Sequence, residues 1–279
     1  MRETTMAEPE RPVVSRSQKV VDYGSTIQTR TYAARAARQA SFVLIESAQR
    51  YSKMSHNTLS PHESQDRWQR VEFFLNVLNQ ICIGFVTIYI SYLTLRTGLE
   101  GTSLHAWLVT IGFSFFMAEG VMIHYGGNVL THSYKRHTKT TIHWIVLTLG
   151  GCCGASGALI KMIQKGFSLH STHGKLGFTA FILCILAMTS GLSALFSARV
   201  KRLITPLLNK TFHNFLGFAC FVIALVTQYY GYQTGYFTNR SETDFQILMK
   251  CLTLTSLVLS SYGPMKALYQ KCENISRQF

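Results

Sequence analysis

Six long apolar segments dominate the chain and restrict what it can fold into. Each is close to the ~20 residues that a helix needs to cross ~30 Å of hydrocarbon. A transmembrane β-barrel would show alternating segments of about ten residues instead. The connections are short, so neighbouring helices should run antiparallel. The sequence therefore predicts an all-α membrane protein with six spanning helices, at approximately 73–95, 104–125, 141–160, 174–198, 212–232 and 244–265.

The charge balance agrees with a membrane protein. Charged residues make up 14% of the chain, against about 25% in an ordinary soluble domain. The 27 basic and 13 acidic residues leave a net charge of +14. On a soluble protein this charge would suggest nucleic acid, but beside long apolar segments it is typical of basic cytoplasmic loops. We therefore expect a lipid bilayer as a partner and no nucleic acid.

The distribution of charge divides the chain into parts. Residues 1–70 hold 11 Lys or Arg and 7 Asp or Glu and have no long apolar run, which predicts a basic, mostly disordered cytoplasmic tail. The pattern of residues 31–51 also fits an amphipathic helix on an anionic membrane surface, and a solvated tail fits equally well. The start has no apolar core of a secretory signal peptide. Residues 71–268 form the predicted transmembrane domain, and residues 269–279 form a cytoplasmic C-terminal tail.

The loops predict the orientation. Basic residues gather after the second and fourth segments and at both termini, whereas the alternate loops are less basic, which places both termini in the cytoplasm. We expect the endoplasmic reticulum or another endomembrane rather than the plasma membrane. Asn239 begins a glycosylation sequon in a predicted outer loop. The basic residues on the predicted inner side include Lys135, Arg136, Lys139, Arg199, Lys201, Arg202, Lys210, Lys266, Lys271 and Arg277.

Four of the ten histidines open four successive apolar segments. One histidine at a helix start is usually an interfacial residue or a cap, but four in a row indicate a shared role. Because neighbouring helices alternate in direction, His105 and His173 should lie at the outer level and His143 and His213 at the inner level. In a four-helix bundle, facing side chains of this kind build cofactor sites.

Glycines follow these histidines at helical spacing. Gly112 and Gly150 come seven residues after the second-segment and third-segment histidines, and Gly177 and Gly217 come four residues after the next two. Offsets of four and seven lie on one helix face. We interpret the glycines as flat patches on which a planar macrocycle can lie.

The pairs of histidines therefore predict two bis-histidine b haems per chain, held by segments two to five. Two axial imidazoles leave the iron no open position, so such a haem carries electrons and does not bind oxygen. The predicted haem-binding residues are His105, His173, His143 and His213.

The core of roughly 190 residues resembles the cytochrome b561 family, which has six helices with a histidine on the second to fifth. The resemblance rests on the stretch FSFFMAEGVMI at 113–123, on Ile142-His143-Trp144 and on Thr172-His173-Gly174. Ala106 departs from the family, which commonly has proline after the first histidine. The first 70 residues have no counterpart that we can place.

The resemblance implies a transmembrane ascorbate-dependent reductase. Cytoplasmic ascorbate would reduce the inner haem, and the outer haem would reduce ferric chelate or monodehydroascorbate. Ascorbate is a monoanion and needs cationic donors. Lys139 and Lys210 precede the inner histidines by four and three residues, and we expect them to act as catalytic residues, although ordinary basic-loop residues would look the same. Further predicted substrate-binding residues are Lys135 and Arg136 on the inner side and Lys161, Lys165 and His170 on the outer side.

Some alternatives stay open. Glu119 lies inside a segment and suggests a haem-edge hydrogen bond or a proton acceptor. His124 is the main rival ligand for the inner haem. The chain could instead be a non-redox transporter or structural protein; a zinc hydrolase fits less well, because segments two to five carry one carboxylate. A homodimer is compatible with the sequence.

Overall fold

The computed structural model describes residues 67–277 and nine separate helical residues between Arg35 and Gln49. The chain divides into two units, Met1–Arg67 and Trp68–Phe279. The amphipathic helix predicted for residues 31–51 lies largely outside the described residues. The second unit carries everything that follows.

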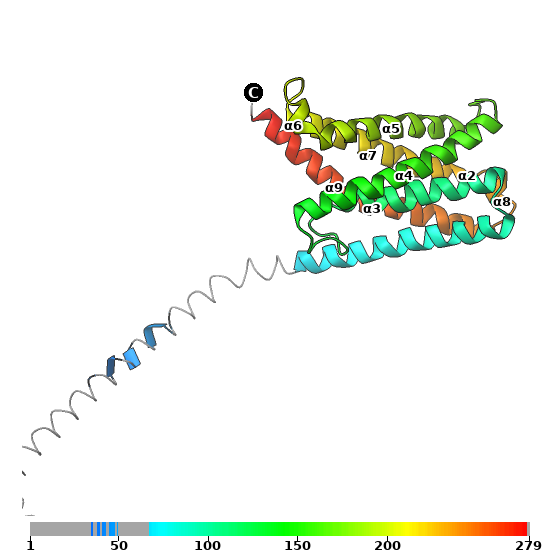
Figure 1. Ribbon diagram of the computed structural model, residues 1–279. Helices are drawn as coiled ribbons and strands as arrows, with labels where there is room; N and C mark the ends of the chain where they lie inside the picture. Colours follow the sequence, from blue (N-terminus) through cyan, green and yellow to red (C-terminus); the bar gives the residue numbers. More distant parts are fainter. Residues whose placement is uncertain are drawn as a thin grey trace, which may run out of the picture. The chain divides into compact units, whose positions relative to one another are not determined.

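Six helices of the second unit are long and apolar enough to cross a membrane, which confirms the predicted fold class (Figure 1). Most extend beyond the apolar segments, because polar residues continue the helical turns past the hydrocarbon. The spans are Arg67–Thr97, Gly101–Met122, Arg136–Gln164, Thr172–Leu195, Pro206–Gly231 and Thr243–Ser276.

The second span is not a uniform α-helix. It consists of α2 (Gly101–Val109), the π-helix η1 (Thr110–Met117) and α3 (Ala118–Met122). A π-helix has i→i+5 hydrogen bonds and turns less per residue than an α-helix. Eight such residues turn the following residues by roughly a third of a turn or more relative to a continuous α-helix. Residues after Met117 therefore face a different side from the one that α-helical spacing predicts.

Local signals explain where the later helices begin. Ser171 accepts a hydrogen bond from the backbone nitrogen of Gly174 (3.0 Å) and caps α5. Thr205 caps α7, whose first residue is Pro206; proline suits this position because its missing N–H would have no helical partner. The remaining elements are α4 (Arg136–Gln164), α5 (Thr172–Leu195), α6 (Ser197–Val200), α7 (Pro206–Gly231), α8 (Gly235–Thr238) and α9 (Thr243–Ser276).

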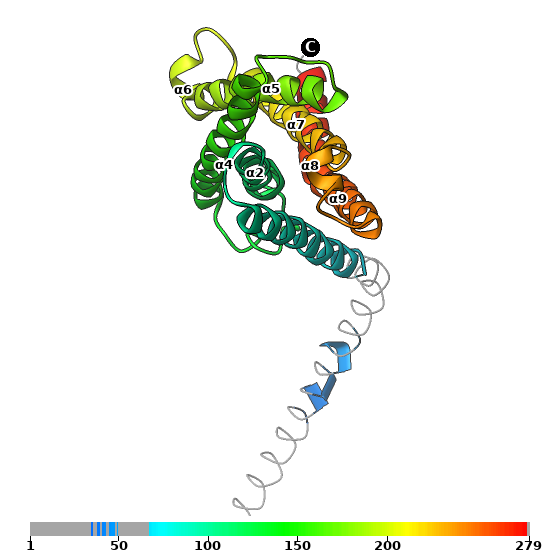
Figure 2. The ribbon, with the colours of Figure 1, turned by 90° about the vertical axis from the view of Figure 1, so that its right-hand side faces the viewer.

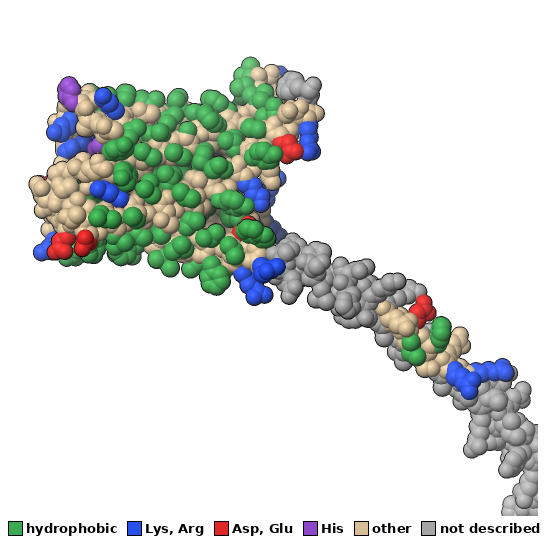
Figure 3. Space-filling model, turned by 180° about the vertical axis from the view of Figure 1, so that it is seen from behind, with side chains coloured by type: hydrophobic (Ala, Val, Ile, Leu, Met, Phe, Trp, Pro, Cys, Tyr) green, Lys and Arg blue, Asp and Glu red, His purple; other side chains and the backbone are tan. Residues whose placement is uncertain are grey.

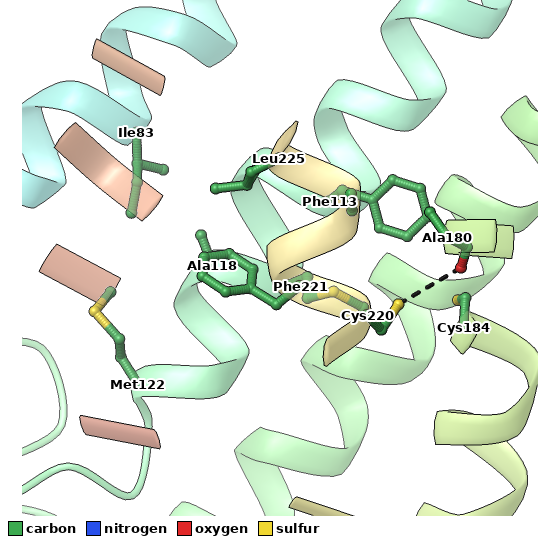
Figure 4. Packing of buried hydrophobic residues seen from close by; sticks show 11 residues of the cluster. Ile83, Phe113, Ala118, Met122, Ala180, Cys184, Cys220, Phe221 and Leu225 are labelled. Atoms are coloured by element: carbon green, nitrogen blue, oxygen red, sulfur yellow. Dashed lines mark hydrogen bonds between the residues drawn. The ribbon is translucent and has the colours of Figure 1, made fainter. Parts of the chain in front are cut away.

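The helices pack in two close pairs. α5 lies along α7, and α4 lies against α2 and η1, while α9 contacts α7 and α3 (Figures 1 and 2). Buried apolar side chains from the first span, η1, α3, α5 and α7 meet in one core (Figure 4). This core connects four of the six spans. Its members include Ile83, Phe113, Met122, Cys184, Cys220 and Phe221.

Hydrophobic side chains cover the middle of the second unit, and charged side chains gather at its two ends (Figure 3). This distribution suits a bilayer around the middle. The basic end contains Arg67, Arg70, Lys135, Arg136, Lys139, Lys210, Lys266 and Lys271. The opposite end contains Arg96, Glu100, Lys161, Lys165, Arg240, Glu242 and Asp244.

Candidate functional site

The four helix-opening histidines form two pairs. At the opposite end, the ring centroids of His105 on α2 and His173 on α5 are 6.2 Å apart, with an angle of 85° between the rings. At the basic end, the centroids of His143 on α4 and His213 on α7 are also 6.2 Å apart, at 88°. Each pair joins two helices that are not consecutive in the chain, so the pairing depends on the whole bundle.

Three of the histidines are oriented by backbone carbonyl groups of a neighbouring helix. A carbonyl oxygen only accepts hydrogen bonds, so the Nδ1 atom of each of these rings carries the proton and Nε2 keeps its lone pair. The Nδ1–oxygen bonds join His105 to Gly157 (2.7 Å), His143 to Gly120 (2.8 Å) and His173 to Thr227 (2.9 Å).

The fourth histidine is oriented by a hydroxyl group. The Nδ1 atom of His213 is 3.2 Å from the Oγ atom of Ser190. Ser190 donates its own proton to the carbonyl oxygen of Ala187 (2.9 Å), so it accepts from His213. All four rings therefore hold Nε2 ready as a metal ligand, with Nδ1–H fixed by a second partner, as is usual for metal-binding histidines.

The separation within each pair fits one metal between two rings. A bond from a metal to an imidazole nitrogen is about 2 Å, and that nitrogen lies about 1 Å from the ring centroid, so two axial imidazoles have centroids about 6 Å apart. Across the residues that the structure describes, no three His, Cys, Asp or Glu side chains converge on one point. The remaining ligands would thus come from a bound group. The four nitrogens of a porphyrin meet this need, and a haem held in this way has no open position on its iron.

The interpretation of two glycines as macrocycle patches is wrong. A Cβ atom on Gly112 would lie 2.6 Å from the carbonyl oxygen of Gly150, and one on Gly150 would lie 2.9 Å from the carbonyl oxygen of Gly112. These glycines face each other and let η1 and α4 approach closely. The close approach brings the carbonyl groups of Gly157 and Gly120 within reach of their histidines.

The other two glycines have more open surroundings. A Cβ atom on Gly217 would meet no atom within 4 Å, and the nearest atom to one on Gly177 would be 3.5 Å away. For these two, a macrocycle patch stays a prediction. Gly191 was not predicted from the sequence, and a Cβ atom on it would lie 2.9 Å from the Cε1 atom of His213. It lies on α5, beside the ring of a histidine on α7, and no short spacing reveals it.

His124 lies beside the pair at the basic end. Its ring centroid is 5.0 Å from that of His143, but the residue as a whole is exposed and no hydrogen bond to a carbonyl group fixes its Nδ1 atom in the described structure. Partial desolvation, His143 and nearby cations lower its pKa to about 4. Those cations are Arg136, Lys139 and Lys271.

The last helix brings a further cation to this end. Lys271 on α9 donates a hydrogen bond to the carbonyl oxygen of Lys210 (3.4 Å), and Lys210 itself is exposed. Within residues 67–277, no carboxylate pairs with either ammonium group. From the sequence, Lys271 is predicted only to mark the basic side, because nothing local shows that α9 ends beside α7. Lys135 is the N-cap residue of α4, and Lys139 is half-buried one turn inside it.

At the opposite end, the predicted substrate-binding residue Lys161 contacts the helix that carries His105. Its ammonium group donates to the Oγ1 atom of Thr102 (2.5 Å), three residues before His105. Lys165 is the C-cap residue of α4, and His170 is exposed in the connection that follows.

Glu119 contacts the first span rather than the histidine rings. Its Oε2 atom accepts a hydrogen bond from the Nε2 atom of Gln80 (3.2 Å). The rotation introduced by η1 accounts for this direction, because continuous α-helical spacing would put Glu119 on the same face as His105.

Comparison with known proteins gives a consistent result. Residues 104–238 match the model of the eukaryotic cytochrome b561 family. The transmembrane reductase CYB561D2 of Homo sapiens is 26% identical over 197 residues, which cover 68% of this chain and 87% of that protein. Its counterpart in Mus musculus is 25% identical over the same length and shares of the two chains. The matched region contains all four paired histidines and the α2–α7 bundle. Over the helical bundle that carries the four paired histidines, the chain is therefore similar to the cytochrome b561 family, whose members bind haem b.

Proposed function

We propose that this protein transfers single electrons across a membrane, from cytoplasmic ascorbate through two b haems to ferric chelate or monodehydroascorbate. The observation that carries the proposal is the pair of bis-histidine arrangements, each with free Nε2 atoms and centroids 6.2 Å apart. His105 and His173 would hold one haem, and His143 and His213 the other. A bound haem supplies an iron that accepts and releases one electron.

The basic end is the proposed donor side. It would face the cytoplasm, because basic residues are retained on that side of membranes, and both termini would lie there. Lys139 and Lys210 would hold the ascorbate anion through charge-assisted hydrogen bonds, with Lys135 and Arg136 close by. Ascorbate loses one electron and one proton as it becomes monodehydroascorbate. The role of these side chains is to bind and orient the anion.

The opposite end is the proposed acceptor side. Lys161 is supported by its contact with Thr102, at the start of the helix that carries His105. Together with Lys165 and His170 it would attract an anionic acceptor such as ferric chelate or monodehydroascorbate. The membrane would be the endoplasmic reticulum or another endomembrane, and a homodimer would be compatible with this arrangement.

Absorption spectroscopy of the purified full chain tests the proposal. We expect b-type bands that develop when ascorbate is added, and a pyridine haemochrome assay should give two haems per chain. In liposomes loaded with ascorbate, external ferric chelate should be reduced, and empty liposomes with the same protein serve as the control. A colourless protein would favour the non-redox transporter or structural protein, and a single haem would contradict the two-site arrangement.

A further inference from the structure

One face of the first span carries four polar side chains within the bundle. Glu72, Asn76, Asn79 and Gln80 are spaced by four, seven and eight residues, which places them on one side of the helix. Asn76 is 6% exposed and Asn79 is 1% exposed. We call these four residues the polar seam. Polar groups in a membrane interior are costly unless they are satisfied, and they often mark a pathway for ions or protons.

The polar seam has a partner for each of its members. Burial and the adjacent Glu72 carboxylate raise the pKa of Tyr125, which lies in the connection at the basic end. Because Glu72 lies at this end and Gln80 bonds to Glu119, the polar seam extends from the basic end to Glu119. Its first and last residues are about 12 Å apart along the helix, at 1.5 Å per residue. The other contacts are Val129 N to Asn76 Oδ1 (3.1 Å), Asn79 Nδ2 to Ser260 Oγ (2.9 Å) and Gln80 Nε2 to Glu119 Oε2 (3.2 Å).

One buried atom in the middle of the polar seam lacks a donor. The Oδ1 atom of Asn79 has no hydrogen-bond partner among the described residues. A buried carbonyl oxygen left in this state destabilises the fold, and a polar site of this kind is where proteins hold buried water. A water molecule here would connect the hydrated basic end with the deeper Gln80.

Glu119 lies next to the backbone group that orients an inner histidine. The carbonyl oxygen of its neighbour Gly120 receives the Nδ1–H bond of His143. Low-dielectric surroundings disfavour a negative charge on Glu119, and the extra positive charge of oxidised iron at the nearby metal position would offset this cost. An added electron would cancel that offset, and protonation of the carboxylate would then remove the cost.

We propose that Glu119 takes up a proton from the basic end, through the polar seam, when the haem held by His143 and His213 is reduced. This inference rests on the proposed function. Ascorbate would give one electron, which would reduce iron(III) of a haem held by His143 and His213 to iron(II), and it would release one proton at the same end. A proton from that pool forms the O–H bond of the Glu119 carboxyl group, so the electron and its compensating charge enter together.

Other titratable groups surround α3 on every neighbouring element. The described hydrogen bond of Glu119 goes to the uncharged Gln80, and no ion pair joins Glu119 to a cation within residues 67–277. No bonded partner of Glu119 in this region can therefore take up the proton in its place, and the proton is assigned to the Glu119 carboxylate. The surrounding groups near this end are Glu72 on the first span, Tyr125 and His124 in the connection, Arg136, Lys139 and His143 on α4, Lys210 and His213 on α7, and Tyr262, Lys266 and Lys271 on α9.

Infrared difference spectroscopy of the haem-loaded protein tests this inference. Reduction with dithionite should produce a carboxylic C=O band that shifts in D2O. The band should disappear in Glu119→Gln, move in Glu119→Asp and persist in the control Glu242→Gln at the opposite end. Asn79→Leu should delay the band without removing it, because the polar seam is interrupted. The potential of the inner haem should fall as pH rises in the parent and lose this dependence in Glu119→Gln.

Two results would overturn the inference. One is the absence of the carboxylic band in a parent protein that shows both haems, and the other is a band that is unchanged in Glu119→Gln. If Glu119→Gln does not fold, Glu119→Asp must move the band. A parent protein without haem would instead overturn the proposed function, and this inference with it, so the absorption spectrum separates the two failures.

Discussion

The two histidine pairs have the same ring separation but different surroundings. At the opposite end, both rings are oriented by backbone carbonyl groups, and Lys161 is the cation joined by a hydrogen bond to the start of α2. At the basic end, one ring depends on the hydroxyl group of Ser190, and a fifth imidazole, His124, lies beside the pair. The backbone repeats one arrangement twice, and side chains make the two ends unlike. A direction of electron flow would therefore depend on those side chains rather than on the pairs.

The largest expected effect is the loss of the haem at one end while the haem at the other end is kept. His143→Ala should lower the haem content from two per chain to one, and His105→Ala should remove the other haem, because each pair would hold its own group. Haem-to-protein ratios and low-temperature spectra of the two variants measure this. Loss of both haems from a folded variant, or retention of both, would contradict separate sites.

A substitution between the ends should disturb both of them. Gly112→Ala places a methyl group 2.6 Å from the carbonyl oxygen of Gly150 and should destabilise the protein by about 1–3 kcal/mol through overpacking. Gly84→Ala is the matched control, because its Cβ atom would meet nothing within 4 Å. Thermal unfolding in detergent, followed by haem absorbance at each end, makes the comparison. A melting temperature of Gly112→Ala at or above that of the parent would show that the helix contact is not tight.

Removing one cation from each end in turn should show whether the two ends have different roles. Lys139→Ala should weaken the apparent ascorbate affinity about tenfold or more, because a charge-assisted hydrogen bond contributes roughly 1.5–3 kcal/mol. Lys139→Glu should be worse, since it repels the anion. Lys161→Ala should leave reduction by ascorbate unchanged and slow the transfer to ferric chelate. Stopped-flow measurements decide this, with dithionite as a reductant that needs no binding site; equal ascorbate rates in all variants would remove Lys139 from the site.

The smallest effect concerns the one hydroxyl group among the four acceptors. Ser190→Ala should loosen the inner haem by about 1 kcal/mol, or about fivefold in affinity, because His213 loses its Nδ1 partner. Thr189→Ala is the control, since that hydroxyl group bonds to its own helix. The rate of haem transfer to a competing haem-binding protein measures the difference. Identical rates for the two variants would mean that Ser190 does not orient His213.

The predictable part of the molecule depends on signals that are local or topological. Spans can be recognised because length and apolarity are properties of a continuous segment. The pairing of His105 with His173 follows from alternating helix directions alone. Neither inference requires knowledge of which helix faces touch, and both the fold class and the resemblance to the cytochrome b561 family were confirmed.

The part that was not predicted depends on contacts between helices. The π-helix at Thr110–Met117 has no sequence signal, and it directs Glu119 toward the first span. Gly112 and Gly150 have the spacing of a cofactor patch, but the same spacing serves a close helix crossing. The carbonyl groups that orient three of the histidines are backbone groups. Every residue type has one, so no residue type marks these positions in the sequence. The sequence shows that Lys271 is charged, but its position beside Lys210 follows only from the packing of α9 against α7.

The two contacts made by α7 have a consequence for synthesis of the protein. This helix carries His213, which completes one pair, and it also supplies the carbonyl oxygen of Thr227, which orients His173 in the other. A nascent chain that has inserted only the first four spans therefore has no finished pair at either end. Insertion of Pro206–Gly231 completes both together, so a cofactor held by either pair would be loaded only after this segment is in place.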